Sequence, residues 1–577
     1  MRFLFVSNPA TGQVNPLLAI SSELLSRGHE VHFCSADRLS RSFGKMAVKT
    51  GHGDRGYFHG VGSGRECEDL TDLVQSKPDL FHNIIRHKPG ALTTYLNAVC
   101  KLGDESTASD VYKRVVFRVR DVCIETKADM IIVDNFSPFA MDGVRLSGLP
   151  YIQTSPAAAC AAASFVNLFK QPVGLSGADS GHRKADGSRT WAQAIFLVWR
   201  NFTFVFSFVW WCMTHPYAKE KRRFRKDELG LPPVDFLADS YMTPAPHLVP
   251  HMRAALSFNV AGLDLYDPKV FHEKVFFVGP CFAPGHGPKA IAQHSSLQPD
   301  AVKEWLDESE EVIYVNMGSI FYYPRDEYDA LIDALKGVKA VRPNMRALIK
   351  IPDLPTTFQP IPGADELPGW IRRETWVPSV ETVLAHPSVK IAMHHGGGNS
   401  FNEAVAFGKP QLIVSMWGET HDIMAYAVHH GIAMGSKFAP RLVASDLQAS
   451  MTKLLEENIE FADRALRWRL RSEQSGGTPI AADIIEAYGS KERRIQGTQD
   501  GDSTDIEAVN ALTIDSNEKG LFTPALDKEP QSSSASSIGS PTIAEQTVTF
   551  PSPTDFPPRP QLLIQTAAAA PVVAATA

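Results

Sequence analysis

A glycine-rich stretch, HHGGGNSFNEA at residues 394–404, carries the side chains best suited to chemistry in this sequence. It follows the apolar run VKIAM and opens a helical pattern, so backbone N–H groups would converge there and favour an anion. His395 and Ser400 can donate to phosphate oxygens beside the backbone of Gly397, and Glu403 can accept from two ribose hydroxyls. The stretch outlines a nucleotide diphosphate site; the alternative is a glycine turn needed only for close packing.

The sequence on either side of this loop can complete such a site. Upstream, Trp376 offers a ring that can stack on a base, and the backbone of Val377 could pair with the base edge. Trp376 could equally be a core anchor. Downstream, GETHD places Glu419 and Thr420 at the carboxyl end of another strand, where they suit sugar hydroxyls, although a solvated turn would look the same.

Two further polar side chains follow apolar strands in the first part of the chain. Gln13 lies in NPATGQVNPLL (residues 8–18), after the strand pattern RFLFVS, and Asp134 ends the strand pattern MIIVD. Open parallel sheets bind their ligands at the carboxyl ends of the strands. We therefore expect Gln13 and Asp134 to belong to one ligand site.

The elements that position these residues follow an alternating strand and helix pattern. RFLFVS, the helix to Gly28, HEVHFCS, MIIVD and YIQTS indicate one parallel α/β sheet. EEVIYVNMGSI, RALIKI, VKIAM and QLIVS indicate a second. We predict an α/β fold of two doubly wound domains facing each other across a cleft, with the bounds 1–282 and 301–492, a Gly- and Pro-rich linker at 283–300, and a disordered tail at 493–577.

Composition narrows the class of protein. The 577 residues exceed what a single core usually supports, and the net charge of −7 gives no sign of a nucleic-acid partner. The seven cysteines form no CxxC pair, which favours unpaired thiols in a reducing compartment and no metal site. MRFLFVSNP has too short an apolar run for a secretory signal, so we expect a cytoplasmic protein.

Motif order makes a family resemblance specific. WVPSVETVLAHPSV, HHGGGNSFNEAVAFGKP and MWGETHD, with GQVNPLLAISSELLSRGHEV at the front and VGP at 278–280, resemble the UDP-dependent glycosyltransferases with the GT-B fold, of fungal type. The likeness covers about residues 1–490. It implies two Rossmann-like domains, an acceptor pocket in the first and a UDP-sugar site in the second. By position it assigns the uracil to Trp376, the diphosphate to His395, Asn399 and Ser400, the ribose to Glu403, the sugar to Glu419, and the cleft lining to Gly318 and Ser319.

Three positions depart from the pattern of that family. Ser379 stands where a glutamine usually meets the uracil edge, and Thr420 where an amide usually meets the sugar. Gln13 stands where the front motif usually has a histidine that acts as general base. Glutamine cannot take up a proton at any relevant pH.

Three explanations of Gln13 remain open. Asp134 could act as the base, directly or through water, while Gln13 orients the acceptor hydroxyl. The acceptor could instead be acidic enough, as a phenol or carboxylic acid is, to need little help. In the third explanation the chain binds a nucleotide sugar without turning it over.

A hydrophobic stretch followed by basic residues marks positions 195–226. Its aromatic residues and the six basic residues at 219–226 suit a peripheral membrane contact. The alternatives are an acceptor pocket or core with a solvated basic helix, and a membrane span, which Arg200 and Asn201 would interrupt. The first two readings share one consequence, an apolar acceptor.

We therefore expect metal-independent, inverting transfer of a sugar, glucose by resemblance, from a UDP-sugar co-substrate to a hydroxyl of a hydrophobic small molecule or lipid. No other cofactor is expected. The absence of DxD-type carboxylate motifs from the donor region fits a site where N–H donors and a helix dipole neutralise the diphosphate. The rival functions are a catalytically silent nucleotide-sugar-binding protein that supports a partner enzyme, and a nucleotide-sugar epimerase or hydrolase.

Overall fold

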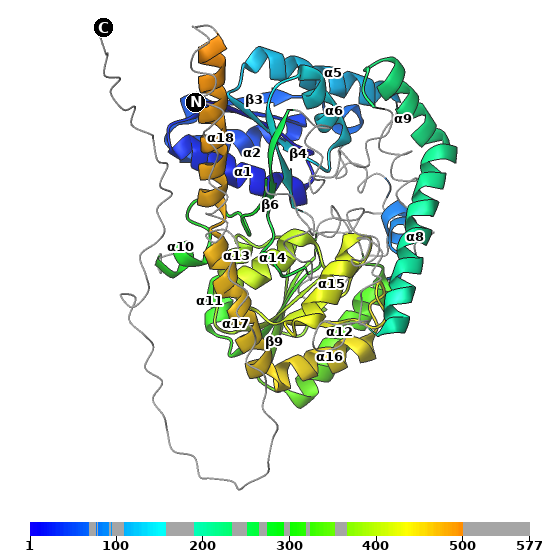
Figure 1. Cartoon of the computed structure of the whole chain (residues 1–577). Helices are drawn as coiled ribbons and strands as arrows, with labels where there is room; N and C mark the ends of the chain where they lie inside the picture. Colours follow the sequence, from blue (N-terminus) through cyan, green and yellow to red (C-terminus); the bar gives the residue numbers. More distant parts are fainter. Residues whose placement is uncertain are drawn as a thin grey trace, which may run out of the picture. The chain divides into compact units, whose positions relative to one another are not determined.

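The structure of the chain is a computed structural model (Figure 1). All residues that it describes belong to one compact unit. Ser319, which was predicted to line the cleft, lies outside the described residues, and so does the predicted tail after Gln499. The structure describes residues 1–67, 77, 79–89, 91, 94, 109–156, 190–232, 251–264, 274–293, 301–318, 323–351 and 366–499.

The first sheet has seven parallel strands among the described residues, in the order β3-β2-β1-β4-β5-β6-β7. Its chain order reverses direction between β1 and β4, which makes that pair the topological switch point. The strands are β1 (Arg2–Val6), β2 (Glu30–Ser35), β3 (Gly56–Gly60), β4 (Met130–Asp134), β5 (Tyr151–Ser155), β6 (Met252–Ser257) and β7 (Val275–Phe277).

The second sheet has six parallel strands among the described residues, in the order β10-β9-β8-β11-β12-β13. Its switch point lies between β8 and β11. The strands are β8 (Glu311–Asn316), β9 (Met345–Lys350), β10 (Ile371–Glu374), β11 (Val389–His394), β12 (Gln411–Ile413) and β13 (Ala433–Gly435). The prediction of two parallel α/β sheets is confirmed.

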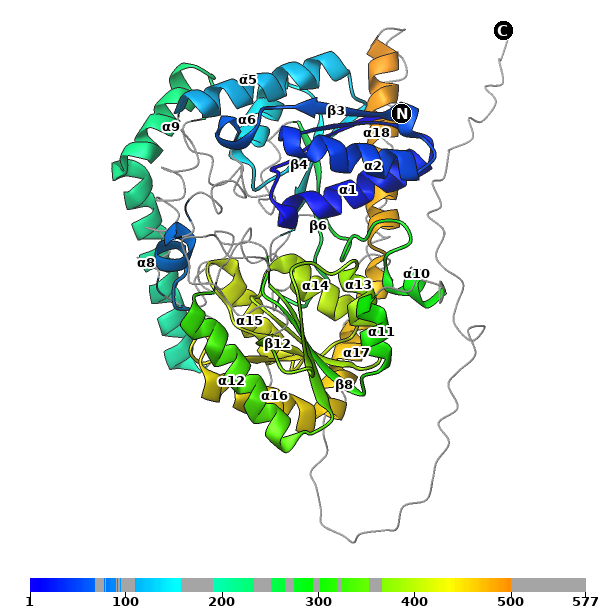
Figure 2. The same cartoon turned by 180° about the vertical axis from the view of Figure 1, so that it is seen from behind.

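Alternating side chains explain why helices cover both faces of each sheet. In β1, Leu4 packs toward α5 (Ser109–Thr126) and α6 (Pro138–Ser147), whereas Phe3 packs toward α1 (Thr11–Ser26) and α2 (Ser40–Lys49). In the second sheet α12 (Arg325–Val341) and α16 (Ala444–Glu456) lie side by side on one face (Figure 2). The opposite face packs against α11 (Ala301–Asp307), α13 (Val380–Ala385) and α14 (Gly398–Ala406).

The connection between the two sheets is not purely irregular. The expected linker at 283–300 contains the short helix α10 (Pro288–Gln293), with Ile291 packed against the core of the second sheet. Pro288 at its first position explains where this helix can begin in a Gly- and Pro-rich segment. The remaining helices are α8 (Trp191–Thr214), α9 (Pro216–Asp227), α15 (Glu419–His429), α17 (Asn458–Ser475) and α18 (Thr478–Gln499).

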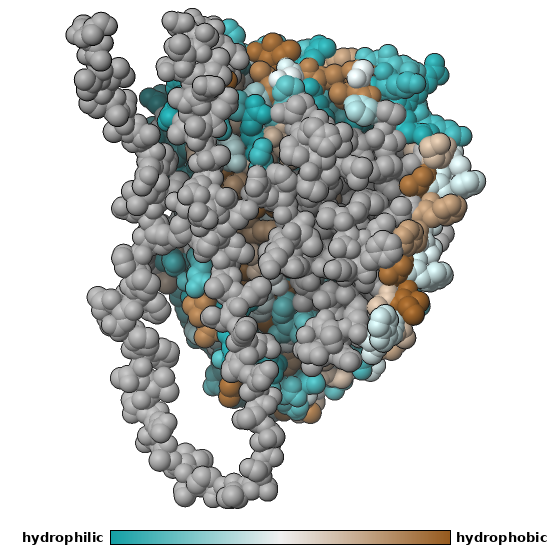
Figure 3. Space-filling view, in the orientation of Figure 1, coloured by the Kyte–Doolittle hydropathy of each residue, from teal (hydrophilic) through white to brown (hydrophobic). Residues whose placement is uncertain are grey.

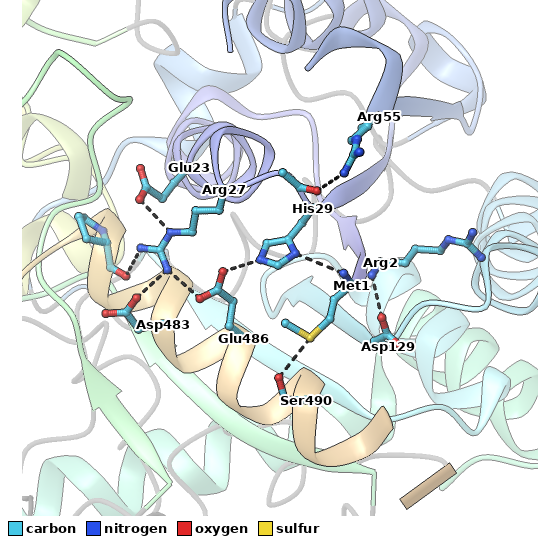
Figure 4. A network of polar contacts seen from close by, with 12 residues as sticks. Met1, Arg2, Glu23, Arg27, His29, Arg55, Asp129, Asp483, Glu486 and Ser490 are labelled. Carbon is cyan, nitrogen blue, oxygen red and sulfur yellow. Dashed lines mark hydrogen bonds and ion pairs between the residues drawn. The ribbon is translucent and has the colours of Figure 1, made fainter. Parts of the chain in front are cut away.

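The last helix joins both ends of the described chain. Figure 4 shows Arg27 reaching Asp483 and Glu486 of α18, at 2.6 and 2.8 Å. His29 Nε2 lies 2.5 Å from Glu486 Oε1, and the sulfur of Met1 accepts from Ser490. Helix α18 extends to Gln499, past the domain boundary predicted at residue 492, and its apolar face completes the core that covers β1.

Candidate functional site

The two switch points place polar residues at the carboxyl ends of adjacent strands. In the first sheet, the chain leaves β1 at Ser7 and leaves β4 just after Asp134. In the second, it leaves β8 toward Gly318 and leaves β11 toward His395. Asp134, Gly318 and His395 were predicted as site residues. The segment that follows β1 leads through Asn8 to the turn that precedes Gln13.

Asp134 is a buried carboxyl at the first switch point, with 1% of its surface exposed. Its Oδ1 accepts from the backbone N–H of Phe136 at 3.0 Å, while its Oδ2 has no hydrogen-bond partner among the described residues. Burial raises the pKa of Asp134 to about 7, against the lowering effect of the backbone N–H groups of Phe136 and Asn8. A carboxyl with this pKa can exchange a proton near neutral pH.

Gln13 lies in the first turn of α1 and is half-buried. The turn that leads to it is fixed by Asn8, whose Oδ1 accepts from the Ala10 N–H at 2.8 Å. The backbone N–H of Gln13 in turn donates to Ala10 O at 3.0 Å. Because the Asn8 N–H also contacts the Asp134 carboxyl, this short turn ties the segment of Gln13 to the buried acid.

The glycine loop is held in shape by the buried side chain of His394. Its Nδ1 accepts from the Gly396 N–H at 3.0 Å, which leaves Nε2–H to donate to Gln411 Oε1 at 2.7 Å. Burial lowers the pKa of His394 to about 4, so the neutral ring that this pattern requires is the stable form. Gly396 has φ +83°, a conformation that glycine adopts without strain.

His395 lies between two glycines. A Cβ on Gly318 would come within 2.5 Å of His395 Cε1, and one on Gly397 within 2.4 Å of His395 Nε2. The ring therefore occupies the space that the two glycines leave open for it. Burial, with smaller effects of His394 and Lys350, lowers the pKa of His395 to about 3, so the ring is neutral and can offer an N–H donor without a charge.

The start of α14 follows this histidine directly. Gly397 is its N-cap residue, and Asn399 and Ser400 lie in its first turn, all half-buried. The first-turn N–H groups of a helix have no partners within the helix and attract anions. At Gly398 the second domain approaches the first, because a Cβ there would lie 2.8 Å from Pro156 O, just after β5.

A lysine that the sequence analysis missed lies among the residues predicted to hold the nucleoside. Lys350 ends β9 with 8% of its surface exposed, and its Nζ lies 4.4 Å from the ring centroid of Trp376. Burial lowers its pKa, whereas the charge of Glu403 raises it. Burial and the neighbouring Glu381 raise the pKa of Glu403 to about 8, against the effect of Lys350.

Trp376 is 66% exposed, so its ring is open to a ligand and is not the core anchor that was the alternative. Val377 beside it has a buried side chain packed in the core below, which leaves its backbone as the part that can meet a base. Ser379 is the N-cap of α13: its Oγ accepts from the Thr382 N–H at 3.0 Å and donates to Glu381 Oε2 at 3.0 Å.

The loop predicted to hold the sugar begins α15. Glu419 is the first residue of that helix and is half-buried. Thr420 is buried, and its Oγ1 accepts from the backbone N–H groups of Met416 and Trp417 at 2.9 and 3.0 Å and donates to Trp417 O at 2.6 Å. The Thr420 hydroxyl therefore stabilises the loop by hydrogen bonding to its backbone.

A segment from the first part of the chain forms hydrogen bonds with the loop that precedes α15. Residues 79–89, which lie between β3 and α5 in sequence, place Leu80 and Ile85 in the core of the second sheet. The Gly418 N–H donates to His87 Nε2 at 3.0 Å, and the His87 N–H donates to Met416 O at 3.0 Å. Burial lowers the pKa of His87, which keeps Nε2 available as an acceptor.

A buried ion pair fixes this segment. Arg86 Nη2 lies 2.8 Å from Glu327 Oε2 of α12, with 2% and 4% of the two side chains exposed, and Glu327 also meets Arg441 at 2.8 Å. Neither Arg86 nor His87 stands in a recognisable motif, so no sequence signal indicated them. Within the described residues no group of three or more His, Cys, Asp or Glu side chains could hold a metal ion.

Lys350→Met is expected to weaken binding of a nucleotide sugar by about 10- to 100-fold, because it removes a cation next to Trp376 and Glu403. Isothermal titration with UDP would measure this. Lys336→Met, on an exposed position of α12, is the matched control and should leave the affinity unchanged. An unchanged affinity in Lys350→Met would place the nucleotide elsewhere.

His87→Phe is expected to raise the KM for the donor by about tenfold, since the ring would still pack on His421 but the Gly418 N–H would lose its acceptor. Steady-state kinetics with varied donor checks this. His52→Phe, in the loop before β3, serves as control. If both variants keep the wild-type KM, the segment 79–89 has no part in shaping the sugar loop.

Two doubly wound parallel sheets are the architecture of the GT-B glycosyltransferases, and the chain has this fold. Residues 367–466 match the family model for UDP-glucoronosyl and UDP-glucosyl transferases. Together with the fungal relatives described next, this match supports a glycosyltransferase of the UDP-glycosyltransferase family, of fungal type.

Relatives with glycosyltransferase names match the sequence, and a solved structure shares the fold. The chain is 25% identical to erythritol-mannosyl-transferase 1 of Mycosarcoma maydis, over 94% of this chain and 100% of that protein. It is 26% identical to the limonoid UDP-glucosyltransferase of Citrus unshiu, over 39% of this chain and 44% of that protein. The fold is similar to that of the glycotransferase of kitacinnamycin, with a TM-score of 0.56 and 19% identity over 84% of this chain and 98% of that one.

Proposed function

We propose that the chain transfers a hexosyl group, with inversion and without a metal, from a nucleoside diphosphate sugar to a hydroxyl of an apolar or amphiphilic small molecule. One observation carries the proposal. A carboxyl with a pKa of about 7 ends β4 at one switch point, and a glycine loop and helix start suited to a diphosphate lie at the other.

In the proposed reaction the Asp134 carboxylate takes the proton of the acceptor hydroxyl while that oxygen attacks the anomeric carbon of the donor. The new glycosidic bond forms as the bond to the diphosphate oxygen breaks, which inverts the anomeric centre. The start of α14 and the neutral N–H of His395 would stabilise the charge on the departing diphosphate. Gln13 would orient the acceptor by hydrogen bonding. Asn399 and Ser400 would contact the same phosphates.

For the donor we propose that Trp376 stacks on the base, that Glu403 accepts from the ribose and that Glu419 binds the sugar. Glucose follows from the family resemblance. A mannosyl donor is the second candidate, because the relatives that match along their whole length are named mannosyl-transferases. The hydroxyls of Ser379 and Thr420 accept hydrogen bonds from neighbouring backbone N–H groups. This also supports a donor that differs from the usual one of the family.

For the acceptor we propose an apolar molecule with one accessible hydroxyl, taken up by the first domain. The same relatives carry erythritol, a polyol, in their names, so a polyol belongs among the acceptors to be compared. We also propose that the enzyme works in the cytoplasm, since Cys34, Cys123 and Cys281 are free thiols, which fits a reducing compartment.

The deciding experiment measures nucleotide release by the purified full chain from UDP-glucose, UDP-mannose and GDP-mannose. Each donor is supplied alone and with erythritol, a phenol, a sterol or a hydroxy fatty acid. Release that depends on an acceptor, with a glycoside detected by mass spectrometry, supports transfer and names both substrates.

The other outcomes separate the rival functions. Release without an acceptor would identify a hydrolase. Conversion of the sugar without nucleotide release would identify an epimerase. Donor binding without either would leave a silent binding protein and would end the proposal of catalysis.

A further inference from the structure

Helix α8 carries a long exposed stripe of aromatic and aliphatic side chains. At 1.5 Å per residue the stripe is about 33 Å long. Trp191 is 87% exposed and Phe206 70%, and successive members lie three or four residues apart, so they share one side of the helix. The members, which we name the α8 stripe, are Trp191, Ile195, Trp199, Phe202, Phe206, Trp210 and Met213.

The next helix is strongly basic although the chain as a whole carries a net charge of −7. Helix α9 contains six Lys or Arg residues and two Asp or Glu residues. Lys219, Arg223 and Lys226 are exposed, and only Arg223 of these three pairs with an acid of the helix, Asp227 at 3.7 Å. An exposed cluster of this kind attracts an anionic surface.

Helix α9 is anchored firmly to the first domain. Phe224 is buried and packs edge-on against Tyr112 of α5, with ring centroids 5.8 Å apart. Arg225 Nη1 lies 2.8 Å from Asp142 Oδ1 of α6, and both side chains are buried. The exposed lysines are therefore presented by a fixed helix and do not hang on a loose loop.

The two helices are linked so that stripe and basic cluster adjoin. One residue, His215, separates them, and the Arg222 guanidinium donates to the sulfur of Met213 at the end of the stripe, 2.9 Å away. In Figure 3 hydrophobic residues follow the edge of the molecule where Figure 1 places α8, and hydrophilic residues gather where it places α9.

We propose that α8 and α9 form a docking surface for an anionic membrane, with the α8 stripe in the interfacial layer and the α9 lysines among the headgroups. Trp and Phe favour that layer, and adjacent basic residues add attraction to anionic lipid. None of the described helices is long and apolar enough to cross a membrane. The proposed contact is peripheral, and it is independent of the reaction proposed above.

Co-sedimentation of the full chain with vesicles tests the proposal. The chain should bind phosphatidylcholine vesicles that contain phosphatidylserine, and weakly or not at all those without it, and added salt should release it. Lys219→Gln with Lys226→Gln should weaken binding by about fivefold per lost charge. Trp199→Gln with Phe206→Gln should weaken it by about tenfold or more.

Matched controls on the second domain define the background. Ile459→Gln replaces an aliphatic residue of α17 that is 86% exposed, and Lys453→Gln replaces an exposed lysine of α16, and neither should change binding. Equal losses in controls and test variants, or no binding of the wild type to anionic vesicles, would overturn the proposal.

Two further results keep the test decisive. If the Trp199 and Phe206 variant unfolds, as thermal unfolding would reveal, the lysine variant and the salt dependence still decide. Sedimentation velocity without lipid checks for a dimer. A dimer that the stripe variant dissociates would assign the stripe to a second copy of this chain and refute the membrane contact.

Discussion

Replacing Asp134 by asparagine is expected to lower kcat/KM for an aliphatic alcohol acceptor by about 10²–10⁴-fold, because the variant keeps the shape of the site but has no base. In the wild type, kcat/KM should rise with pH through a midpoint near pH 7, where the buried carboxyl loses its proton. In Asp134→Asn this midpoint should disappear. Steady-state kinetics between about pH 5 and pH 9 would check both results.

The same substitution distinguishes the explanations of Gln13. If the acceptor is acidic enough to need no base, Asp134→Asn should retain activity toward phenols. If Asp134→Asn keeps full activity on aliphatic alcohols while Gln13→Ala abolishes it, Asp134 is not the base.

Asp134→Asn should also stabilise the fold above neutral pH, opposite in sign to its effect on catalysis. The pKa of this carboxyl is raised from 3.8 to about 7, so ionisation favours the unfolded chain as pH rises through that window. The full difference is on the order of 4 kcal/mol above the folded pKa, and it vanishes below pH 3.8. Thermal unfolding at about pH 5 and pH 8.5 measures the larger part of it, with the exposed Asp333→Asn as control. A variant less stable than wild type at the higher pH would contradict a raised pKa of the buried Asp134 carboxyl.

Gly318→Ala is expected to weaken donor binding by about 10- to 100-fold and to lower the free energy of unfolding by about 2 kcal/mol or more. Gly318 has φ +84°, and its new Cβ would lie 2.5 Å from His395 Cε1, so the histidine ring must move away from the phosphate position. Titration with UDP and chemical denaturation measure the two effects.

A second glycine separates the clash from the backbone strain in this prediction. Gly285 has φ +86°, and no atom lies within 4 Å of the place that a new Cβ would take, so Gly285→Ala carries the strain alone. It should lose about 1–2 kcal/mol of stability and keep its donor affinity. Equal affinities of the two variants for UDP would remove His395 from the diphosphate site.

The sequence predicted those parts of the site that follow directly from strand ends. Asp134 and the loop around His395 each come straight after an apolar strand, and parallel strands carry such residues to one edge of the sheet. The two parallel sheets and the GT-B fold are confirmed. The roles of Gln13 and of the donor residues remain predictions.

Other parts depend on contacts that no local pattern reveals. Lys350 also ends a strand, yet its candidate role depends on its contact with Trp376, which lies in a loop. His87 acts on Gly418 across a separation of 331 residues. The hydroxyls of Ser379 and Thr420 looked free for a ligand in the sequence, but short-range capping and loop hydrogen bonds engage them.

Helix α18 has a consequence for how the protein is made. Ala481, Ala482 and Ile485 complete the core around Phe3 and Phe5, which the ribosome adds to the chain long before them. The first sheet must wait, with one apolar face incompletely covered, until both domains and α18 itself have been synthesised. We therefore expect forms shortened before α18 to be unstable, because they lack the contact that joins the two ends of the fold.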